Sequence, residues 1–189
     1  MRVVLLLGML LLGGFLLYSV VLVKRTGVTK GGLVTCADGR CFLTMHVHAL
    51  VRVEVCGQAV ALPSFKGPLS GAHTHSEKNV VHWHDKLEID PETKAPLDPS
   101  PLALGVAFEN LGIPLSETRL GDKANGDPCP DGLPGTLAVF VNGESLEDAP
   151  AYVWSDRDII DLMFDARTVE EAQQAVRERP RAFPPLGEG

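Results

Sequence analysis

Apolar and polar residues alternate along two segments of the chain, and this pattern predicts β-strands. In residues 45–55 every odd-numbered position is apolar, whereas most even-numbered positions are polar or charged. The turn-forming residues 56–58 (Cys-Gly-Gln) then precede a second apolar run at 59–62, so we expect a β-hairpin here. Residues 80–89 alternate in the same way and predict a further strand.

Two helices are predicted from the residues at their ends. Ser100 and the following proline fit the start of the first helix, and Gly112 fits its end. Thr168, followed three residues later by Glu171, forms a capping box that begins the second helix. Further strands are expected at 137–141, which a turn at Asn142-Gly143 ends, at 151–154 and at 159–164, with loops at 69–76, 91–101 and 120–135.

Hairpin, helix and further strands together predict an α+β fold, in which a small mixed sheet packs on one main helix in a β-grasp-like arrangement. We expect an N-terminal transmembrane helix before this domain and a C-terminal helix after it. By residue number, the expected parts are a transmembrane anchor (1–25), a linker with a cysteine loop (26–44), a histidine-rich α+β metal-binding domain (45–166) and a C-terminal helix with a proline-rich tail (167–189).

Residues 3–23 form an uncharged apolar run near the amino terminus. A helix of this length is about 31 Å long, which is enough to cross the hydrocarbon core of a bilayer. A secretory signal peptide has a shorter apolar stretch and a small-residue cleavage site, and residues 17–20 provide no such site. We therefore expect an uncleaved single-pass anchor, with a cleaved signal peptide or a buried core helix as alternatives.

The chain has four cysteines, and their spacing matches no zinc finger, haem-attachment motif or redox C-x-x-C pair. Of the three possible pairings we favour Cys36 with Cys41 and Cys56 with Cys129, and free thiols are the alternative. Structural disulfides form in oxidising compartments. We therefore expect a cell-membrane protein whose soluble domain lies on the periplasmic or extracellular side.

The composition is ordinary for a folded protein, with 45% hydrophobic and 22% charged residues. The net charge of −7 at pH 7 disfavours nucleic acid as a partner, because phosphate binding requires a basic surface. The expected partners are instead the membrane itself and a membrane protein. No nucleophile elbow, P-loop or dinucleotide fingerprint is present in the sequence, so no catalytic residue is assigned.

The histidines carry the strongest chemical signal in the sequence. All six occur in three H-x-H pairs, whereas chance would give about 0.2 such pairs. Residues two apart on a strand project from the same face, so each pair can offer two imidazoles to one cation, and a neighbouring strand can complete the shell. The predicted metal ligands are His46, His48, His73, His75, His82 and His84.

Imidazole ligands suit zinc or copper better than calcium or magnesium, so the expected cofactor is a zinc or copper ion, bound either once or twice. We expect His73, His75 and His82 to converge across one short loop and to matter most, and His84 to matter least. Carboxylates that can orient the imidazoles are also close in sequence or on the same strand face. These are Glu54, Glu77, Asp85 and Glu88.

Residues 73–84 (HTHSEKNVVHWH) resemble a motif of the form H-T-H-D-x-x-G-I-I-H-[VI]-E. That motif is typical of a family of membrane-anchored, extracytoplasmic proteins of bacteria and archaea. The same family has M-H-I-H, similar to 45–48 (MHVH), then L-G-x-x-F-x-x-W-G, similar to 104–112 (LGVAFENLG), and V-x-V-N-G, similar to 139–143 (VFVNG). The resemblance covers about residues 45–164, with all landmarks in order.

The chain departs from the family pattern at four positions. Ser76 replaces the motif aspartate, Asn79 replaces the glycine, and Leu111 replaces the helix tryptophan. His84 stands where the family has glutamate, which exchanges one possible metal ligand for another. The other five histidines match the family positions, so the resemblance implies that the metal site is retained.

Three functions are compatible with these features. The first is a membrane-tethered protein that binds copper or zinc for metal handling or as an accessory subunit of a membrane assembly. The second is a zinc-dependent hydrolase or lyase with three histidines, a metal-bound water and Glu77 or Glu88 as general base. The third is a structural or interaction subunit. The absence of a recognisable nucleophile and the number of histidines favour the first.

Overall fold

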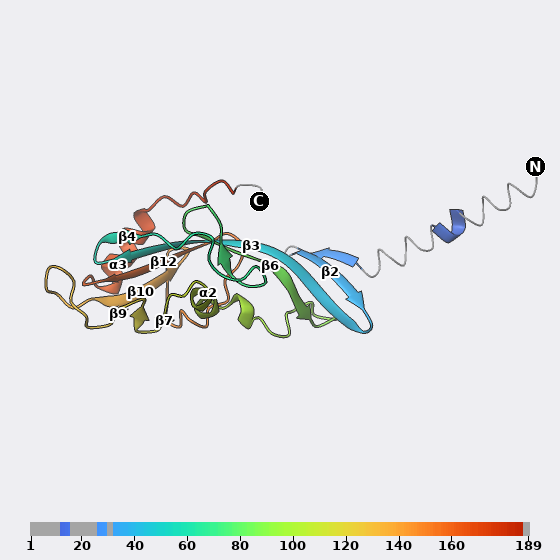
Figure 1. The fold of residues 1–189 in the computed structure, drawn as a ribbon, viewed down its shortest axis with the longest axis horizontal. Helices are drawn as coiled ribbons and strands as arrows, with labels where there is room; N and C mark the ends of the chain where they lie inside the picture. The colour runs from blue at the N-terminus through green and yellow to red at the C-terminus, as the bar shows by residue number, and fades with distance from the viewer. Residues whose placement is uncertain (1–11, 16–25, 30–31, 187–189) are drawn as a thin grey trace, which may run out of the picture. The chain divides into compact units, whose positions relative to one another are not determined.

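The computed structural model describes residues 12–15, 26–29 and 32–186 of the chain (Figure 1). The chain separates into two compact units. One unit comprises the chain up to residue 45 together with residues 86–98, and the other comprises residues 46–85 together with the chain from residue 99 onward. The six histidines all belong to the second unit.

Within the described residues, nine strands form one mixed sheet along the order β1-β2-β3-β12-β10-β11, with β4 paired to β3 and β6 paired to both β3 and β5. The long strand β3 runs parallel to β12, while β2 and β4 pair with β3 in antiparallel fashion. The strands are β1 (Thr26–Thr29), β2 (Gly32–Ala37), β3 (Arg40–Val55), β4 (Gln58–Val60), β5 (His73–Thr74), β6 (Val80–Ile89), β10 (Thr136–Val141), β11 (Glu144–Leu146) and β12 (Asp158–Asp165). A separate small sheet contains β7 (Leu115–Ser116), β8 (Arg119–Leu120) and β9 (Lys123–Ala124).

The predicted alternation is confirmed in β3 and β6. On β3, Val47 and Ala49 are buried, His46 before them is exposed and His48 between them is half-buried. β6 coincides with the predicted strand at 80–89. β3 turns at residues 56–57 into β4, in the register Val55 to Gln58, so the predicted hairpin is confirmed.

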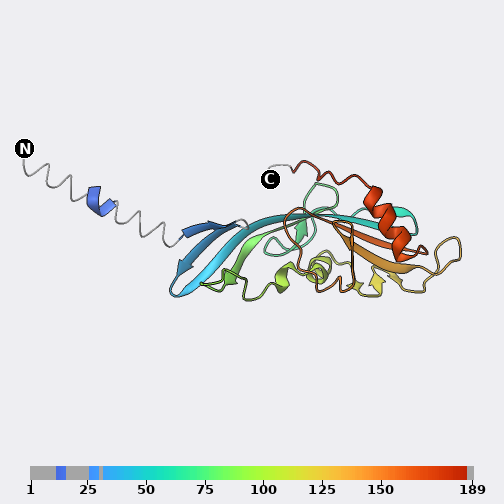
Figure 2. The same cartoon turned by 180° about the vertical axis from the view of Figure 1, so that it is seen from behind.

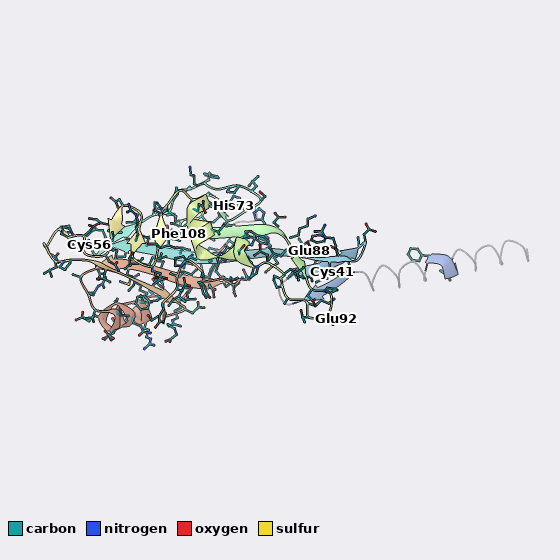
Figure 3. The ribbon with its side chains drawn as sticks, turned by 90° about the horizontal axis from the view of Figure 1, so that it is seen from below. Cys41, Cys56, His73, Glu88, Glu92 and Phe108 are labelled. Atoms are coloured by element: carbon teal, nitrogen blue, oxygen red, sulfur yellow. A yellow bond between two sulfur atoms is a disulfide. The ribbon has the colours of Figure 1, made fainter. Side chains whose placement is uncertain are left out.

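In the first unit, β1, β2 and the start of β3 pair in antiparallel fashion. A small core of Val34, Cys41, Leu43 and Ile89 lies between them. Arg40 and Glu88 form a bidentate ion pair with N···O distances of 2.7 and 2.5 Å, and Figure 3 marks Cys41 and Glu88 in this region. Residues 26–32, which were expected to be a linker, therefore supply strand β1 and the first residue of β2.

The helix at the centre of the chain is shorter than expected. Residues 100–102 form a 3₁₀ turn, η1 (Ser100–Leu102), and the α-helix α2 begins only at Leu104 and ends at Asn110. Ser100 does not cap α2, because Ala103 in extended conformation separates the two turns. The predicted end is confirmed, since Gly112 takes a φ of +74° and the Ile113 N–H donates to the Phe108 carbonyl in a Schellman arrangement.

The C-terminal helix α3 (Val169–Glu178) begins as predicted. Thr168 is its N-cap, and both hydrogen bonds of the capping box with Glu171 are present. Ala172 and Val176 of α3 pack against Phe140 and Met163 of the sheet. α2 lies on the opposite side of β10 and β12, so the two helices cover different faces of the second unit (Figures 2 and 3).

Three local predictions are wrong for tertiary reasons. Residues 151–154 form no strand, because only Val153 makes a bridge, to Ala103 at the start of α2. The loop predicted at 69–76 contains β5, and the loop predicted at 120–135 contains β9. These two-residue strands form by pairing with a neighbouring segment, β5 with β6 and β9 with β8, and loop-type residues do not reveal such pairing. The fold is mostly β, and the predicted mixed sheet is confirmed. In place of one main helix, the described residues contain the short helices α2 and α3.

The disulfides join Cys36 to Cys41 and Cys56 to Cys129, as predicted. Two disulfides indicate an oxidising compartment outside the cytoplasm. Of the predicted transmembrane segment 3–23, only residues 12–15 are described, and they are helical; the rest lies outside the described residues. Among the described residues, no helix is both long and apolar enough to span a membrane.

Candidate metal centre

His46 and His48 lie on the polar face of β3. Because the strand alternates, the buried Val47 between them points to the other face, and the two imidazoles stand side by side with ring centroids 4.5 Å apart. His48 is further held by Asp156, whose Oδ1 accepts the His48 backbone N–H at 2.9 Å and lies 3.4 Å from its Nδ1. The predicted same-face placement of this pair is confirmed.

His73 and His75 flank Thr74, a buried residue whose hydrogen bonds hold this segment in place. The Thr74 hydroxyl donates to the Pro63 carbonyl at 2.6 Å, and the Thr74 backbone N–H donates to the Lys66 carbonyl at 2.9 Å. In the antiparallel register of β5 and β6, His73 stands opposite His82. His73 and His75 are therefore placed directly beside His82 and His84 of β6.

Asn79 positions the start of β6. It takes a φ of +61°, a conformation that asparagine tolerates better than most residues and that glycine adopts freely. Its carbonyl accepts the Val51 N–H at 2.8 Å, and its side-chain oxygen accepts the Leu62 N–H at 2.9 Å. Asparagine is thus compatible with this turn, and the turn connects the start of β6 to β3.

The six histidines gather into one cluster with two subgroups. We call them the β3 group, which is His46, His48 and His82, and the β5 group, which is His73, His75 and His84. Within each group the ligand nitrogens all lie within 4.8 Å of one another. The groups also adjoin each other, since the rings of His75 and His82 are 4.6 Å apart and those of His46 and His84 are 5.0 Å apart.

The β5 group has its nitrogens at the spacing of a metal site. Nε2 of His73 lies 3.2 Å from Nε2 of His75 and 2.9 Å from Nε2 of His84. Nitrogens bound to tetrahedral zinc at 2.0–2.1 Å are about 3.3 Å from one another. His73 is almost completely buried, and its ring orientation is fixed because Nδ1 donates to the Gly71 carbonyl at 2.7 Å.

The electrostatics of the cluster favour neutral imidazoles. Burial, followed by the neighbouring His48 and His75, lowers the pKa of His82 to about 4. Burial is also the main cause that lowers the pKa of His48 and of His84, and adjacent histidines act in the same direction. Neutral imidazole is the form that binds metal, so these rings keep a lone pair available at neutral pH.

The four carboxylates considered from the sequence have different surroundings. Glu77 lies beside the cluster, with Oε2 3.8 Å from Nε2 of His82. Glu54 instead binds Arg167 and Arg179, and Glu88 binds Arg40. Asp85 follows His84 on β6 and is half-buried. Glu77 therefore lies within reach of a histidine of the cluster, whereas Glu54 and Glu88 are engaged by arginines.

The observed grouping differs from the expected one. His73 and His75 were expected to converge with His82, but their third neighbour is His84, while His82 joins the β3 pair. The reason is the position of β6, which pairs with β3 as well as with β5. Sequence reasoning missed Asp156 and the Gly71 carbonyl, because neither belongs to a metal-ligand pattern and Asp156 is 108 residues from His48.

The chain matches no protein-family model, no curated protein and no solved structure. Fold and site therefore define its class directly. It is a disulfide-linked, mostly β domain carrying two groups of three histidines that can hold metal.

Proposed function

We propose that the chain is a membrane-anchored, extracytoplasmic protein that binds zinc or copper through its histidine cluster. Its proposed role is metal handling, or service as an accessory subunit of a membrane assembly. The observation that carries the proposal is the spacing of the Nε2 atoms of His73, His75 and His84, at 3.2 and 2.9 Å from the central His73. Three imidazole nitrogens at this spacing favour a nitrogen-liking transition metal over calcium or magnesium.

The burial of the cluster supports reversible metal binding. His73 and His82 are buried, whereas His46 is exposed, so the group extends from the interior of the second unit to its surface. Burial of a neutral imidazole costs less desolvation free energy than burial of a charged ligand. The exposed His46 gives an ion a route of entry from solvent.

Membership of the extracytoplasmic family described above is part of this proposal. The motifs that carry the resemblance fall on β3, on the β5–β6 hairpin, on α2 and on the turn after β10. The motifs on β3 and on the β5–β6 hairpin carry the six histidines, which supports the proposed relationship. The apolar run at 3–23 supports the membrane anchor, and the two disulfides support the extracytoplasmic side.

Metal analysis of the purified full-length protein in detergent tests the proposal. After removal of metal, the protein should take up Zn²⁺ or Cu²⁺, and uptake should weaken in acid, where protons compete with the metal for the imidazole lone pairs. A protein in which His46, His73 and His75 are replaced by alanine should bind far less. Metal uptake that is absent, or equal in this variant, would contradict the proposed function.

The membrane location is tested separately. Washed membranes extracted at high pH should retain the full-length chain, because an inserted helix resists extraction. External protease should digest the domain in cells whose outer barrier has been opened but whose inner membrane is intact. Release of the chain at high pH, or protection from protease, would exclude an extracytoplasmic anchored domain.

A further inference from the structure

We propose that the histidine cluster binds two metal ions side by side, one in the β3 group and one in the β5 group, and that Glu77 strengthens only the β3 site. This inference rests on the proposed function and specifies the number and inequality of its sites.

The division of the β6 pair is the first argument for two ions. His82 and His84 are an H-x-H pair, and a single shared ion would be expected to draw both into one shell. Instead, the nitrogens of His82 group with His46 and His48, and those of His84 group with His73 and His75. Each group takes one histidine from β6, so the strand contributes one ligand to each of two neighbouring sites.

The number of imidazoles is the second argument. A zinc ion in a protein site takes about four ligands, so six imidazoles exceed the capacity of one ion. Two groups of three match the three-histidine shell that leaves one position open to water or another small ligand. The centroid distances across the groups, 4.6 Å for His75 to His82 and 5.0 Å for His46 to His84, make the two sites direct neighbours.

The third argument is a pair of buried polar atoms without partners. Nε2 of His82 and Oε2 of Glu77 are both buried and, among the described residues, neither has a hydrogen-bond partner. The His82 side chain is only 5% exposed, and the two atoms are 3.8 Å apart. A buried polar atom without a partner is destabilising. A cation bound at Nδ1 of His82 fixes the ring proton on Nε2, and Nε2 can then donate to a Glu77 carboxylate that moves closer, so that both buried atoms gain a partner.

The two sites therefore differ in the groups that contact their histidine ligands. Glu77 faces His82, which belongs to the β3 group, while in the β5 group the Nδ1 of His73 is held by the neutral Gly71 carbonyl. A carboxylate beside a ligating histidine raises the basicity of that histidine, and loss of such a partner commonly weakens metal binding by about 10- to 100-fold. Glu77 is thus a positioning residue of one site only.

Zn²⁺ stoichiometry of the metal-stripped full-length protein tests the number of sites. We expect two Zn²⁺ per chain in the wild type, one in His46→Ala, one in His75→Ala and none in the double variant. His46 is exposed and His75 half-buried, so both substitutions should leave the fold intact, which circular dichroism checks. One Zn²⁺ in the wild type, abolished by either substitution, would overturn the inference while the proposed function stands. No Zn²⁺ in the wild type would overturn both.

Titration of Glu77→Gln with Zn²⁺ against a chromophoric chelator tests the inequality. We expect two ions to remain bound, with one affinity reduced by about 10- to 100-fold and the other unchanged. When His46→Ala is added, the remaining site should no longer respond to Glu77→Gln. The matched control is Glu147→Gln, which removes an exposed carboxylate far along the chain from the histidines. Equal weakening of both sites, or no change in either, would exclude the assigned role of Glu77.

Electron paramagnetic resonance of the Cu²⁺-loaded protein tests the adjacency of the sites. Two Cu²⁺ ions held in neighbouring groups should give a spectrum broadened or silenced by magnetic coupling. His46→Ala and His75→Ala should each restore the spectrum of an isolated ion. An uncoupled spectrum from a wild-type protein that carries two Cu²⁺ ions would show that the ions are not neighbours.

Discussion

His73 donates a hydrogen bond from Nδ1 to the carbonyl oxygen of Gly71, at 2.7 Å. A carbonyl can only accept, so this contact assigns the proton to Nδ1 and leaves the lone pair on Nε2. That lone pair faces Nε2 of His75 and of His84. A backbone contact two residues before the histidine therefore prepares it as a metal ligand before any ion arrives.

Replacement of His84 distinguishes a ligand from a packing residue. His84→Ala should weaken Zn²⁺ binding at the β5 group by at least about tenfold, because a three-histidine site loses one of its ligands. His84→Glu should stay close to the wild type because a carboxylate oxygen also binds zinc. Zn²⁺ titration of both variants decides the matter. Equal affinity in His84→Ala and the wild type would remove His84 from the site.

The metal-free protein should lose stability in mild acid. In the unfolded chain His82 takes up a proton near pH 6.5, whereas in the folded chain burial lowers its pKa to about 4. Between these values the unfolded state binds more protons, so the free energy of unfolding falls as the pH falls from 6.5 to 4, by about 3 kcal/mol for His82 alone. Above pH 6.5, His82 adds no pH dependence to the free energy of unfolding.

Urea unfolding at pH 7.5 and pH 5 measures this loss. His48 and His84 also have lowered pKa values and should act in the same direction. His82→Gln is the matched variant, because it removes the titrating group while it keeps a polar side chain. If that variant loses as much stability between the two pH values as the wild type does, the assignment to His82 is incorrect.

The two disulfides should differ in their contribution to stability. Cys56–Cys129 closes a loop across a separation of 73 residues, whereas Cys36–Cys41 spans only 5. In the chain-entropy description, loss of the first should cost about 4 kcal/mol and loss of the second about 2 kcal/mol. Chemical denaturation of Cys56→Ala/Cys129→Ala and Cys36→Ala/Cys41→Ala compares them. A larger loss of stability on removal of Cys36–Cys41 would mean that the entropy of the unfolded chain does not determine the contribution of these disulfides.

Asp161 should be essential for the stability of the second unit. Its carboxylate is completely buried on β12 and accepts hydrogen bonds from Arg52 at 2.7 Å and Arg179 at 2.9 Å. Asp161→Ala leaves these two guanidinium groups without their shared partner, so we expect a loss of about 3–5 kcal/mol. The control is Arg177→Ala, which breaks an exposed ion pair with Glu144 and should cost less than about 1 kcal/mol. Thermal unfolding of the two variants should separate them clearly, and similar midpoints would contradict the prediction.

Much of the fold was predictable because its signals are local. The alternation along β3 and β6 follows from the pleat, which places every second side chain on the same face. The turn after β10 was predicted from Asn142 and Gly143, whose residue types tolerate positive φ, and in the structure they take φ values of +54° and +88°. The capping box at Thr168 is likewise contained within four consecutive residues.

The failures concern segments whose conformation depends on the segment that pairs with them. β5 is a strand only because β6 pairs with it, and residues 151–154 fail to form a strand because they meet the start of α2 instead of a long neighbour. Ser100 has the residue type of a helix cap, yet the backbone inserts a 3₁₀ turn before α2. Local propensity is weak enough for tertiary contacts to override it.

The sequence by itself determined which residue types are available for chemistry: three H-x-H pairs, two of them on predicted strands, and four cysteines for which one of three pairings was favoured. Only the tertiary structure decided how the pairs combine. Strand pairing brings His82 to His46 and His48, brings His84 to His73 and His75, and sets Asp156 and Glu77 beside them. Alternation within a strand is fixed by covalent geometry, whereas register between strands is chosen by the packing of the whole sheet.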